Sequence, residues 1–439
     1  MKLSQPISTF RNRYEKGRKL RAAVPRESQA RWVAPKDRAD PLKTLATVNA
    51  GRVAALLPIK EQRMAVSPFA FFRGSAVVMA ADLASLPQTG LNVQLCGDAH
   101  IRNLGAYAAP DGRLVFDLND FDETIPGPWE WDVKRLAVSL VLAGGEAGET
   151  ESRCEGAVRA FAASYRRFLR VFAEMPVAGL ARFLVSRRSA SPVITRILTK
   201  AERVTPRRTL KKLTIEKGGA FRFHDERPLI EHVPRATASA ILHALAGYRE
   251  TLIASRRMVF DAYRAADVAF KLVGTGSVGT RDYVVLMFGN GVGDPLFLQV
   301  KQELPSCYEP YLRPRPRDRH QGQRVAEGQQ RMQTVSDPFL GFTRFGGADY
   351  LVRQLADHKA SLEPADLKGR ALMEYAALCG EVLAKGHART GDAAALAGYC
   401  GASAKLDAAL AEFAAHYAAQ VKADAKLFLK SRARGGMQV

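Results

Sequence analysis

The chain has 439 residues, and its 65 lysines and arginines against 44 aspartates and glutamates give a formal net charge of +21. A hydrophobic fraction of 47% with 25% charged residues is ordinary for globular proteins and excludes a largely disordered chain. The length allows two or three domains, or one large two-lobed unit. The excess of positive charge favours an anionic partner, without choosing among nucleic acid, a membrane surface and the phosphates of a nucleotide.

The apolar stretches and the cysteines exclude further classes of protein. No apolar stretch follows Lys2, so a secretory signal is not expected. The longest strongly apolar run, residues 136–143, is far shorter than the ~20 residues that span a bilayer. We therefore expect a cytoplasmic protein with no membrane span. The cysteines are odd in number and form no CxxC pair, which fits neither a disulfide framework nor a cysteine zinc site.

Along the chain we expect one two-lobed unit built from five segments. The first is a basic and weakly structured N-terminal arm, because lysines and arginines crowd residues 11–21 and prolines interrupt any long helix after them. A segment with polar loops, a helical segment, a small antiparallel sheet and a helical C-terminal region follow. The boundaries of the five segments are 1–60, 61–150, 151–266, 267–310 and 311–439.

The second segment begins a regular pattern. Residues 91–96 alternate between apolar and polar side chains, which predicts a strand that stops at Gly97. Residues 114–116 predict a second strand, with a tight polar loop between the two. Apolar residues from Val133 to Val141 recur at helical spacing and predict a helix with one buried face.

The third segment is predicted to be helical over 158–172 and 241–252, because apolar residues share one face in each. The basic stretch between them, 186–213, is expected to be an exposed connection. Three further strands are predicted over 268–273, 282–288 and 296–301, joined by glycine-rich turns.

The first candidate site lies in the polar loops of the second segment. Carboxylate and asparagine oxygens are ligands that Mg²⁺ accepts, and an aspartate five residues before an asparagine, with another aspartate after the next strand, is the spacing of phosphoryl-transfer sites. Aspartate and asparagine after strands are also common turn formers, and the histidine here could be purely structural. The catalytic candidates are Asp98, His100 and Asn103; the metal candidates are Asn103, Asp120, Asp117 and Asp122.

The second candidate site is a glycine loop in the predicted sheet, with Gly274, Gly276, Ser277 and Gly279. Because this G-x-G-x-x-G lies between two strands rather than between a strand and a helix, it disfavours a dinucleotide-binding fold. A glycine flap between strands suits the covering of phosphates, although glycines also serve a plain turn.

Lys301 ends the third predicted strand of the sheet. Phe297, Gln299 and Lys301 should face one way along it, so the lysine could reach nucleotide phosphates under the flap. A solvated strand lysine is the alternative. Glu327 is the expected partner of Lys301, in competition with Glu303.

These motifs resemble known families. Residues 97–103 look like the G-D-x-H-x-x-N catalytic loop of aminoglycoside phosphotransferases and choline-kinase-like enzymes, and residues 120–123 with Asp132 resemble their metal-binding segment. Cys96 stands where those enzymes often carry a histidine. Residues 67–74, 119–123, 353–355 and 387–392 also resemble the bacterial family catalogued as domain of unknown function 2252.

The order of the motifs departs from that of kinases, in which the glycine flap and lysine precede the catalytic loop. The expected fold is therefore α+β, a protein-kinase-like two-lobed fold that is circularly permuted, with a small antiparallel sheet lobe and a large, mostly helical lobe. Permutation is tolerated where chain termini lie at the surface. His387, Arg389 and Asp392 follow a predicted helix and could touch the active site, but a plain helix terminus with Gly391 as the capping residue is the favoured expectation.

The resemblance implies transfer of a phosphoryl group from ATP, with Mg²⁺, to an unidentified hydroxyl acceptor, either a small molecule or a protein. A non-catalytic nucleotide-binding scaffold and a metal-dependent hydrolase with the same aspartate, histidine and asparagine cluster stay open as alternatives. A nucleic-acid-binding protein ranks third; it would use the basic residues of 11–21, 187–212 and 313–319.

Overall fold

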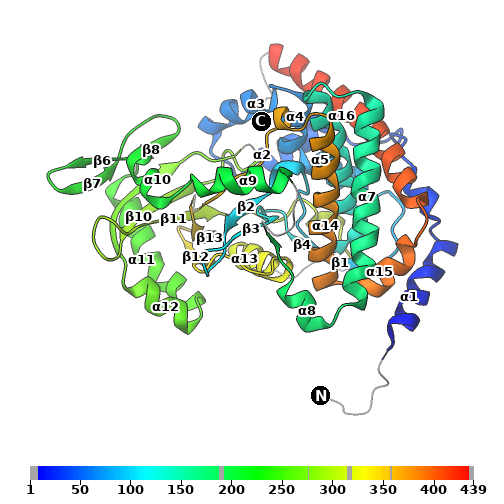
Figure 1. Ribbon diagram of the computed structural model, residues 1–439. Helices are drawn as coiled ribbons and strands as arrows, with labels where there is room; N and C mark the ends of the chain where they lie inside the picture. Colours follow the sequence, from blue (N-terminus) through cyan, green and yellow to red (C-terminus); the bar gives the residue numbers. More distant parts are fainter. Residues whose placement is uncertain (1–7, 187–191, 275, 314–318, 356–357, 435–439) are drawn as a thin grey trace.

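The computed structural model describes residues 8–186, 192–274, 276–313, 319–355 and 358–434. Within them the strands pair antiparallel and form one six-stranded sheet and three smaller sheets. Figure 1 shows the large sheet on one side of the molecule and the long helices on the other. The α+β class predicted from the sequence is confirmed.

The large sheet has the strand order β12-β13-β11-β10-β9-β8. It extends well beyond residue 310, the expected end of the sheet, because two strands come from the region expected to be helical. Glycine-rich turns join β9 to β10 and β10 to β11, as predicted. The strands are β8 (Ile230–His232), β9 (Arg264–Lys271), β10 (Asp282–Phe288), β11 (Pro295–Gln302), β12 (Gly341–Phe345) and β13 (Ala348–Gln354).

Both faces of this sheet are covered. Leu296, Leu298 and Val300 of β11 pack in one cluster with the helices α11 (Arg235–Thr251) and α12 (Ala254–Asp261). Phe297 packs on the opposite face with α10 (Pro206–Leu213) and the hairpin of β6 (Thr214–Lys217) and β7 (Ala220–Phe223). Because side chains alternate along a strand, Lys301 shares the face of Phe297, as predicted.

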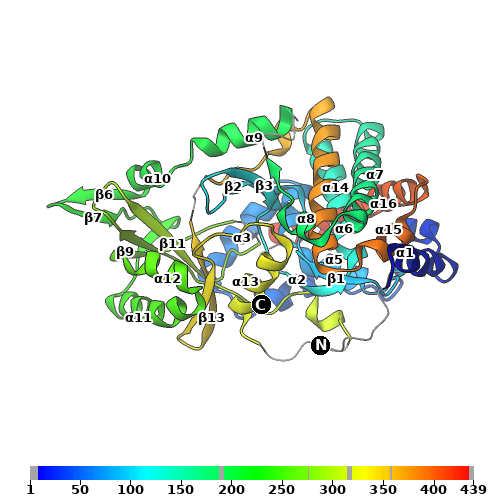
Figure 2. The same ribbon diagram turned by 60° about the horizontal axis from the view of Figure 1, so that its bottom comes forward.

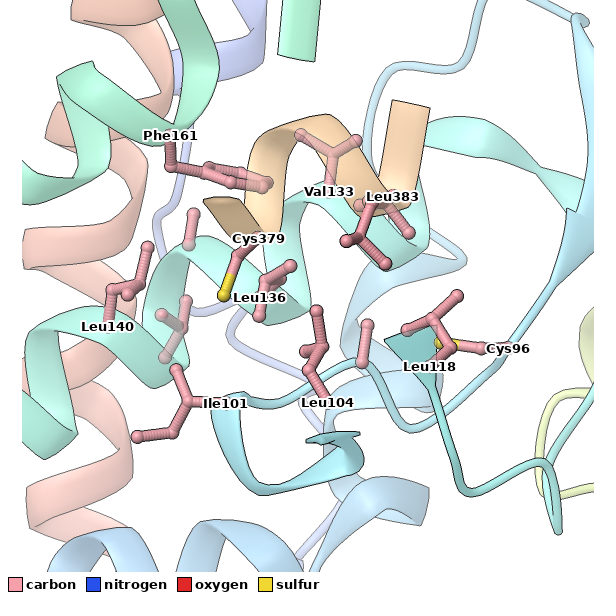
Figure 3. Packing of buried hydrophobic residues seen from close by; sticks show 14 of the residues in the cluster. Cys96, Ile101, Leu104, Leu118, Val133, Leu136, Leu140, Phe161, Cys379 and Leu383 are labelled. Atoms are coloured by element: carbon pink, nitrogen blue, oxygen red, sulfur yellow. The ribbon is translucent and has the colours of Figure 1, made fainter. Parts of the chain in front are cut away.

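A helical body carries the main core. Its long helices are α6 (Trp129–Glu146), α7 (Glu151–Glu174), α14 (Arg370–Thr390) and α16 (Lys405–Ala433). In Figure 3, Leu136 of α6, Phe161 of α7 and Leu383 of α14 point into one apolar cluster, together with Ile101 and Leu104 from the loop segment. The predicted polar loops are therefore anchored to the core by their own apolar residues. The shorter α15 (Ala393–Cys400) follows α14.

Two small sheets frame the loop segment. β1 (Asn92–Leu95) pairs with β4 (Ile125–Pro128), and β3 (Leu114–Leu118) pairs with β2 (Leu104–Ala108) and β5 (Val185–Ser186). The strands predicted near 91–96 and 114–116 are confirmed. The prediction of a tight polar loop between them was wrong, because Leu104–Ala108 forms the strand β2. This short run contains a glycine, and only its pairing with β3 identifies it as a strand.

The N-terminal arm is folded rather than weakly structured. Helix α1 (Phe10–Lys19) packs on α15, and Arg21 and Arg26 donate to the carbonyl oxygens of Tyr399 and Cys400, both at 3.0 Å. Basic side chains are favourable at a helix C-terminus, whose last carbonyls lack partners. The helices that follow are α2 (Pro41–Asn49), α3 (Leu57–Met64), α4 (Pro68–Gly74) and α5 (Ala76–Leu83).

The expected connection 186–213 also contains helices. Residues 187–191 lie outside the described residues, but α9 (Pro192–Glu202) and α10 follow them, and Val193, Ile194 and Ile197 of α9 are buried in the main core. The many basic residues concealed this amphipathic pattern. The remaining helices are α8 (Val177–Arg182) and α13 (Gln321–Met332), which lies between the large sheet and the helical body (Figure 2).

Among the described residues, every helix is either too short or too polar to span a bilayer. All five cysteines are buried, and none forms a disulfide.

Candidate functional site

A single cleft collects most of the predicted site residues. Its walls come from the helices of residues 48–77, from the loop segment 98–123 and from the sheet segment 274–307. The tertiary structure thus joins the two candidate sites that the sequence keeps far apart. The predicted residues that line the cleft are Asp98, His100, Asn103, Asp120, Asp122, Gly274, Gly276, Ser277 and Lys301.

The loop that carries Asp98 is held by the first turn of α6. The backbone N–H groups of Cys96 and Gly97 donate to the two oxygens of Asp132, at 2.8 and 3.0 Å. Gly97 has φ of 91°, and a side chain there would collide with the backbone of Glu123. This position therefore requires glycine.

A histidine of α14 supports the same aspartate. Buried His387 places Nε2 3.3 Å from Asp132 Oδ2, while its Nδ1 lies 2.7 Å from the hydroxyl of Tyr165. Helix α14 ends at Thr390 with Gly391 as its cap residue, as predicted. The helix terminus thus also contacts the anchor of the Asp98 loop, as in the alternative that the sequence left open for this polar cluster.

Asp98 itself is tied to a buried arginine. Arg135 of α6 donates from Nε to Asp98 Oδ1 at 2.5 Å, and His100 Nε2 lies 3.5 Å from Oδ2. The amide nitrogen of Asn103 donates to the Asp98 carbonyl oxygen at 2.7 Å, which leaves the Asn103 amide oxygen as an acceptor. Burial raises the pKa of Asp98 to about 6, against the opposing charge of Arg135.

His100 is a neutral group in this setting. Burial, reinforced by the positive charge of Arg73, lowers the pKa of His100 well below its ordinary value. Its Nδ1 is buried and has no hydrogen-bond partner among the described residues. His100 therefore lies beside Asp98 as an uncharged neighbour.

Asp120 and Asp122 follow β3 and face Lys301. The Lys301 ammonium forms an ion pair with Asp122 Oδ2. Burial alone would raise the pKa of Asp122, but the adjacent lysine holds this pKa below its usual range. Burial and the charge of Asp122 together raise the pKa of Asp120. Oδ1 of both aspartates and Oε1 of Glu303 are buried without a hydrogen-bond partner among the described residues. Unpartnered carboxylate oxygens of this kind fit a cation.

Besides Gly279, two other predicted residues lie outside the cleft. Asp117 is buried in an ion pair with Lys385 of α14, so its proposed role as a metal ligand is corrected: alternation along β3 turns it toward the helical body. The carboxylate of Glu327 accepts from Arg319 and Gln323, both at 2.8 Å. Lys301 is paired with neither Glu327 nor Glu303, because its ammonium forms the ion pair with Asp122 instead.

The glycine loop is tied to the helical wall of the cleft. Val53 N–H donates to the Gly279 carbonyl oxygen at 2.7 Å, and Arg52 donates to the Val278 carbonyl oxygen at 2.6 Å. Arg63 also donates to the carbonyl oxygen of Gly274. Gly279 has φ of 97° and anchors the loop rather than lining the cleft.

Three basic residues of the cleft were missed as site residues. Arg52, Lys60 and Arg73 line the helical wall. Lys60 is only 2% exposed, and burial together with the charge of Arg52 lowers its pKa to about 7. Only Arg73 had a signal in the sequence, because it lies in the segment 67–74 that resembles an uncharacterised family.

The described residues thus define an α+β protein with an acidic cleft between a glycine loop and a helical body. Residues 52–431 match the model of a family described as an uncharacterized protein conserved in bacteria, DUF2252. The chain belongs to this family. Comparison with curated proteins found no match, and neither did comparison with solved structures.

Proposed function

We propose that this protein is an ATP- and Mg²⁺-dependent phosphotransferase with a permuted kinase-like fold, which acts on a hydroxyl acceptor. One observation carries the proposal: Lys301 of the sheet is paired with Asp122 of the loop segment, although 179 residues separate them. The glycine loop and lysine therefore share one cleft with the aspartates and Asn103, as a common nucleotide would require.

The order of elements in the sheet supports this proposal. The glycine loop joins β9 and β10, Lys301 lies on the next strand β11, and helix α13 and then the strands β12 and β13 follow. Protein kinases likewise cover the nucleotide with a glycine-rich loop and place their phosphate-binding lysine on the third strand, ahead of a helix.

A contact between α14 and β1 supports the permutation. The N–H of Gln94 in β1 donates to the hydroxyl of Thr390, the last residue of α14, at 3.1 Å. A chain that ran from the sheet through α14 could continue directly into β1 and the Asp98 loop. A circular permutation of such a chain moves the chain termini, whereas α14 and β1 stay in contact.

The cleft residues have distinct proposed roles. Asp98 orients the acceptor hydroxyl and takes its proton as the acceptor oxygen bonds to the terminal phosphorus and the bond to the leaving diphosphate breaks. Lys301, once released from Asp122, neutralises phosphate oxygens. The backbone N–H groups of the glycine loop would donate hydrogen bonds to the phosphate oxygens.

The amide oxygen of Asn103 and the unpartnered oxygens of Asp120 and Asp122 would hold Mg²⁺, which would supply positive charge to offset the negative charge of the phosphates. No group of three or more acidic, histidine or cysteine side chains in the described residues is arranged to hold a metal by itself. This agrees with the usual binding of Mg²⁺ by one or two carboxylates completed by substrate phosphates.

Replacement of Asp120 tests the proposal. Asp120→Ala should weaken binding of ATP at least tenfold when Mg²⁺ is present, measured by calorimetry, and should abolish ADP release. Asp225→Ala, in the exposed hairpin region, is the matched control and should bind as the wild type does. Unchanged binding and turnover in Asp120→Ala would sink the assignment. Nucleotide binding without ADP release in the wild type would indicate a scaffold, and turnover without a nucleotide a hydrolase.

A further inference from the structure

The side chain of Arg73 has no partner among the described residues. It lies in the last turn of α4 and lines the cleft, yet it forms no hydrogen bond or ion pair with any described residue. Its Nε is buried and unpartnered. By contrast, Arg135 donates to Asp98 and to the Phe72 carbonyl oxygen, and Arg38 forms ion pairs with two aspartates. A buried guanidinium N–H without an acceptor is costly, so this group is suited to an acceptor supplied by a ligand.

The position of Arg73 places that ligand beside Asp98. Arg135 bonds both to Asp98 and to Phe72, the residue before Arg73. Burial lowers the pKa of Arg73, and the neighbouring carboxylates Asp98 and Asp120 oppose this effect. The cation therefore lies close to the carboxylate that would orient the acceptor hydroxyl.

Two more basic residues line the same helical wall. Lys60 is buried, and its ammonium has one hydrogen bond, to Asn49 Oδ1 at 2.8 Å, although it can donate three. Arg52 contacts the glycine loop through the Val278 carbonyl oxygen. Lys301, by comparison, reaches the cleft from the sheet. The cleft therefore has basic side chains on its helical wall as well as on its sheet wall.

We propose that Arg73, with Lys60 and Arg52, forms an anion-binding subsite for the acceptor, so that the acceptor is a hydroxyl compound carrying a phosphate or carboxylate group. The planar guanidinium of Arg73 can donate two parallel hydrogen bonds to such a group. A cationic acceptor would be repelled from this wall. The assignment of the bound anion to an acceptor rests on the proposed function, whereas the binding of an anion by Arg73 does not.

Binding measurements on four proteins test this subsite. Inorganic phosphate, malate and Mg·ATP are each titrated into the wild type, Arg73→Gln, Lys301→Met and the control Arg370→Gln, whose side chain is 91% exposed. We expect Arg73→Gln to weaken phosphate or malate at least tenfold while Mg·ATP changes by less than about threefold, since charge-assisted hydrogen bonds carry that much affinity. Lys301→Met should show the opposite pattern. The relative affinities of phosphate and malate identify the anionic group.

Two other outcomes would overturn the subsite, and a third would separate it from the proposed function. Loss of Mg·ATP affinity in Arg73→Gln with phosphate and malate unaffected would make Arg73 a ligand of the nucleotide instead. A wild type that binds neither phosphate nor malate at millimolar concentration would show that the subsite does not exist. If the wild type binds these anions through Arg73 but never binds Mg·ATP, the anion subsite stands and the proposed phosphotransferase function fails.

Discussion

The buried ion pair between Asp117 and Lys385 allows a test of whether Asp117 has a structural role or binds a metal. The two side chains are 3% and 2% exposed, and Asp117 Oδ1 also accepts from the Leu118 N–H at 2.8 Å. Removal of one partner from a buried pair costs about 3–5 kcal/mol, because the remaining charge is left unpaired. Since Asp117 keeps its backbone hydrogen bond, the lower end, about 3 kcal/mol, is expected for Lys385→Met.

For a chain of 439 residues this loss corresponds to a fall in Tm of about 3 °C, from the usual unfolding entropy per residue. Scanning calorimetry on Lys385→Met, Asp117→Asn and the double variant measures it. Both single variants should lose stability, and the double variant should recover at least half of the loss, because no unpaired charge remains. The affinity for Mg·ATP should not change in any of them. An unchanged Tm in Asp117→Asn together with a tenfold loss of Mg·ATP affinity would refute this reasoning and make Asp117 a metal ligand.

Three further predictions concern the cleft. With a pKa of about 6, the Asp98 carboxyl is protonated below that pH and cannot take a proton. We therefore expect kcat/KM to rise with pH and to level off above about pH 7. A profile that is flat between about pH 5 and 7 would contradict the role of Asp98. Gly97→Ala should lower both Tm and turnover because of the positive φ and the contact with Glu123, and wild-type values for both would show that the loop can adjust. Glu327→Gln should leave the affinity for Mg·ATP within about twofold of the wild type, and a tenfold loss in the same titration would restore Glu327 as the lysine partner.

Local patterns in the sequence were sufficient for the strands and helices with clear periodicity. The alternation over 296–301 correctly predicted that Leu296, Leu298 and Val300 share one face of β11 and that Phe297 and Lys301 lie on the other. Spacing along the chain likewise singled out Asp98, Asn103 and Asp120, because a loop between a strand and a core helix displays its polar groups together. These features depend on neighbours a few residues apart, which the sequence contains directly.

Other features depended on partners far along the chain. Asp117 and Asp120 are both aspartates near the end of β3, and only the position of Lys385 on α14 makes one a buried ion-pair partner and leaves the other in the cleft. Likewise, Arg73 and Lys60 look like ordinary basic residues of a basic segment. Their burial without full partners is a property of the assembled cleft.

The sequence by itself determined the α+β class and the two sets of candidate residues, because periodicity and motif spacing are local properties of the chain. Only the tertiary structure decided that the two sets share one cleft, with Lys301 paired to Asp122 rather than to Glu327. It also decided that Arg52, Lys60 and Arg73 line the acidic cleft. Ion pairs and burial depend on which side chains the fold brings within a few ångströms, and residues that meet across 179 positions of sequence leave no local pattern.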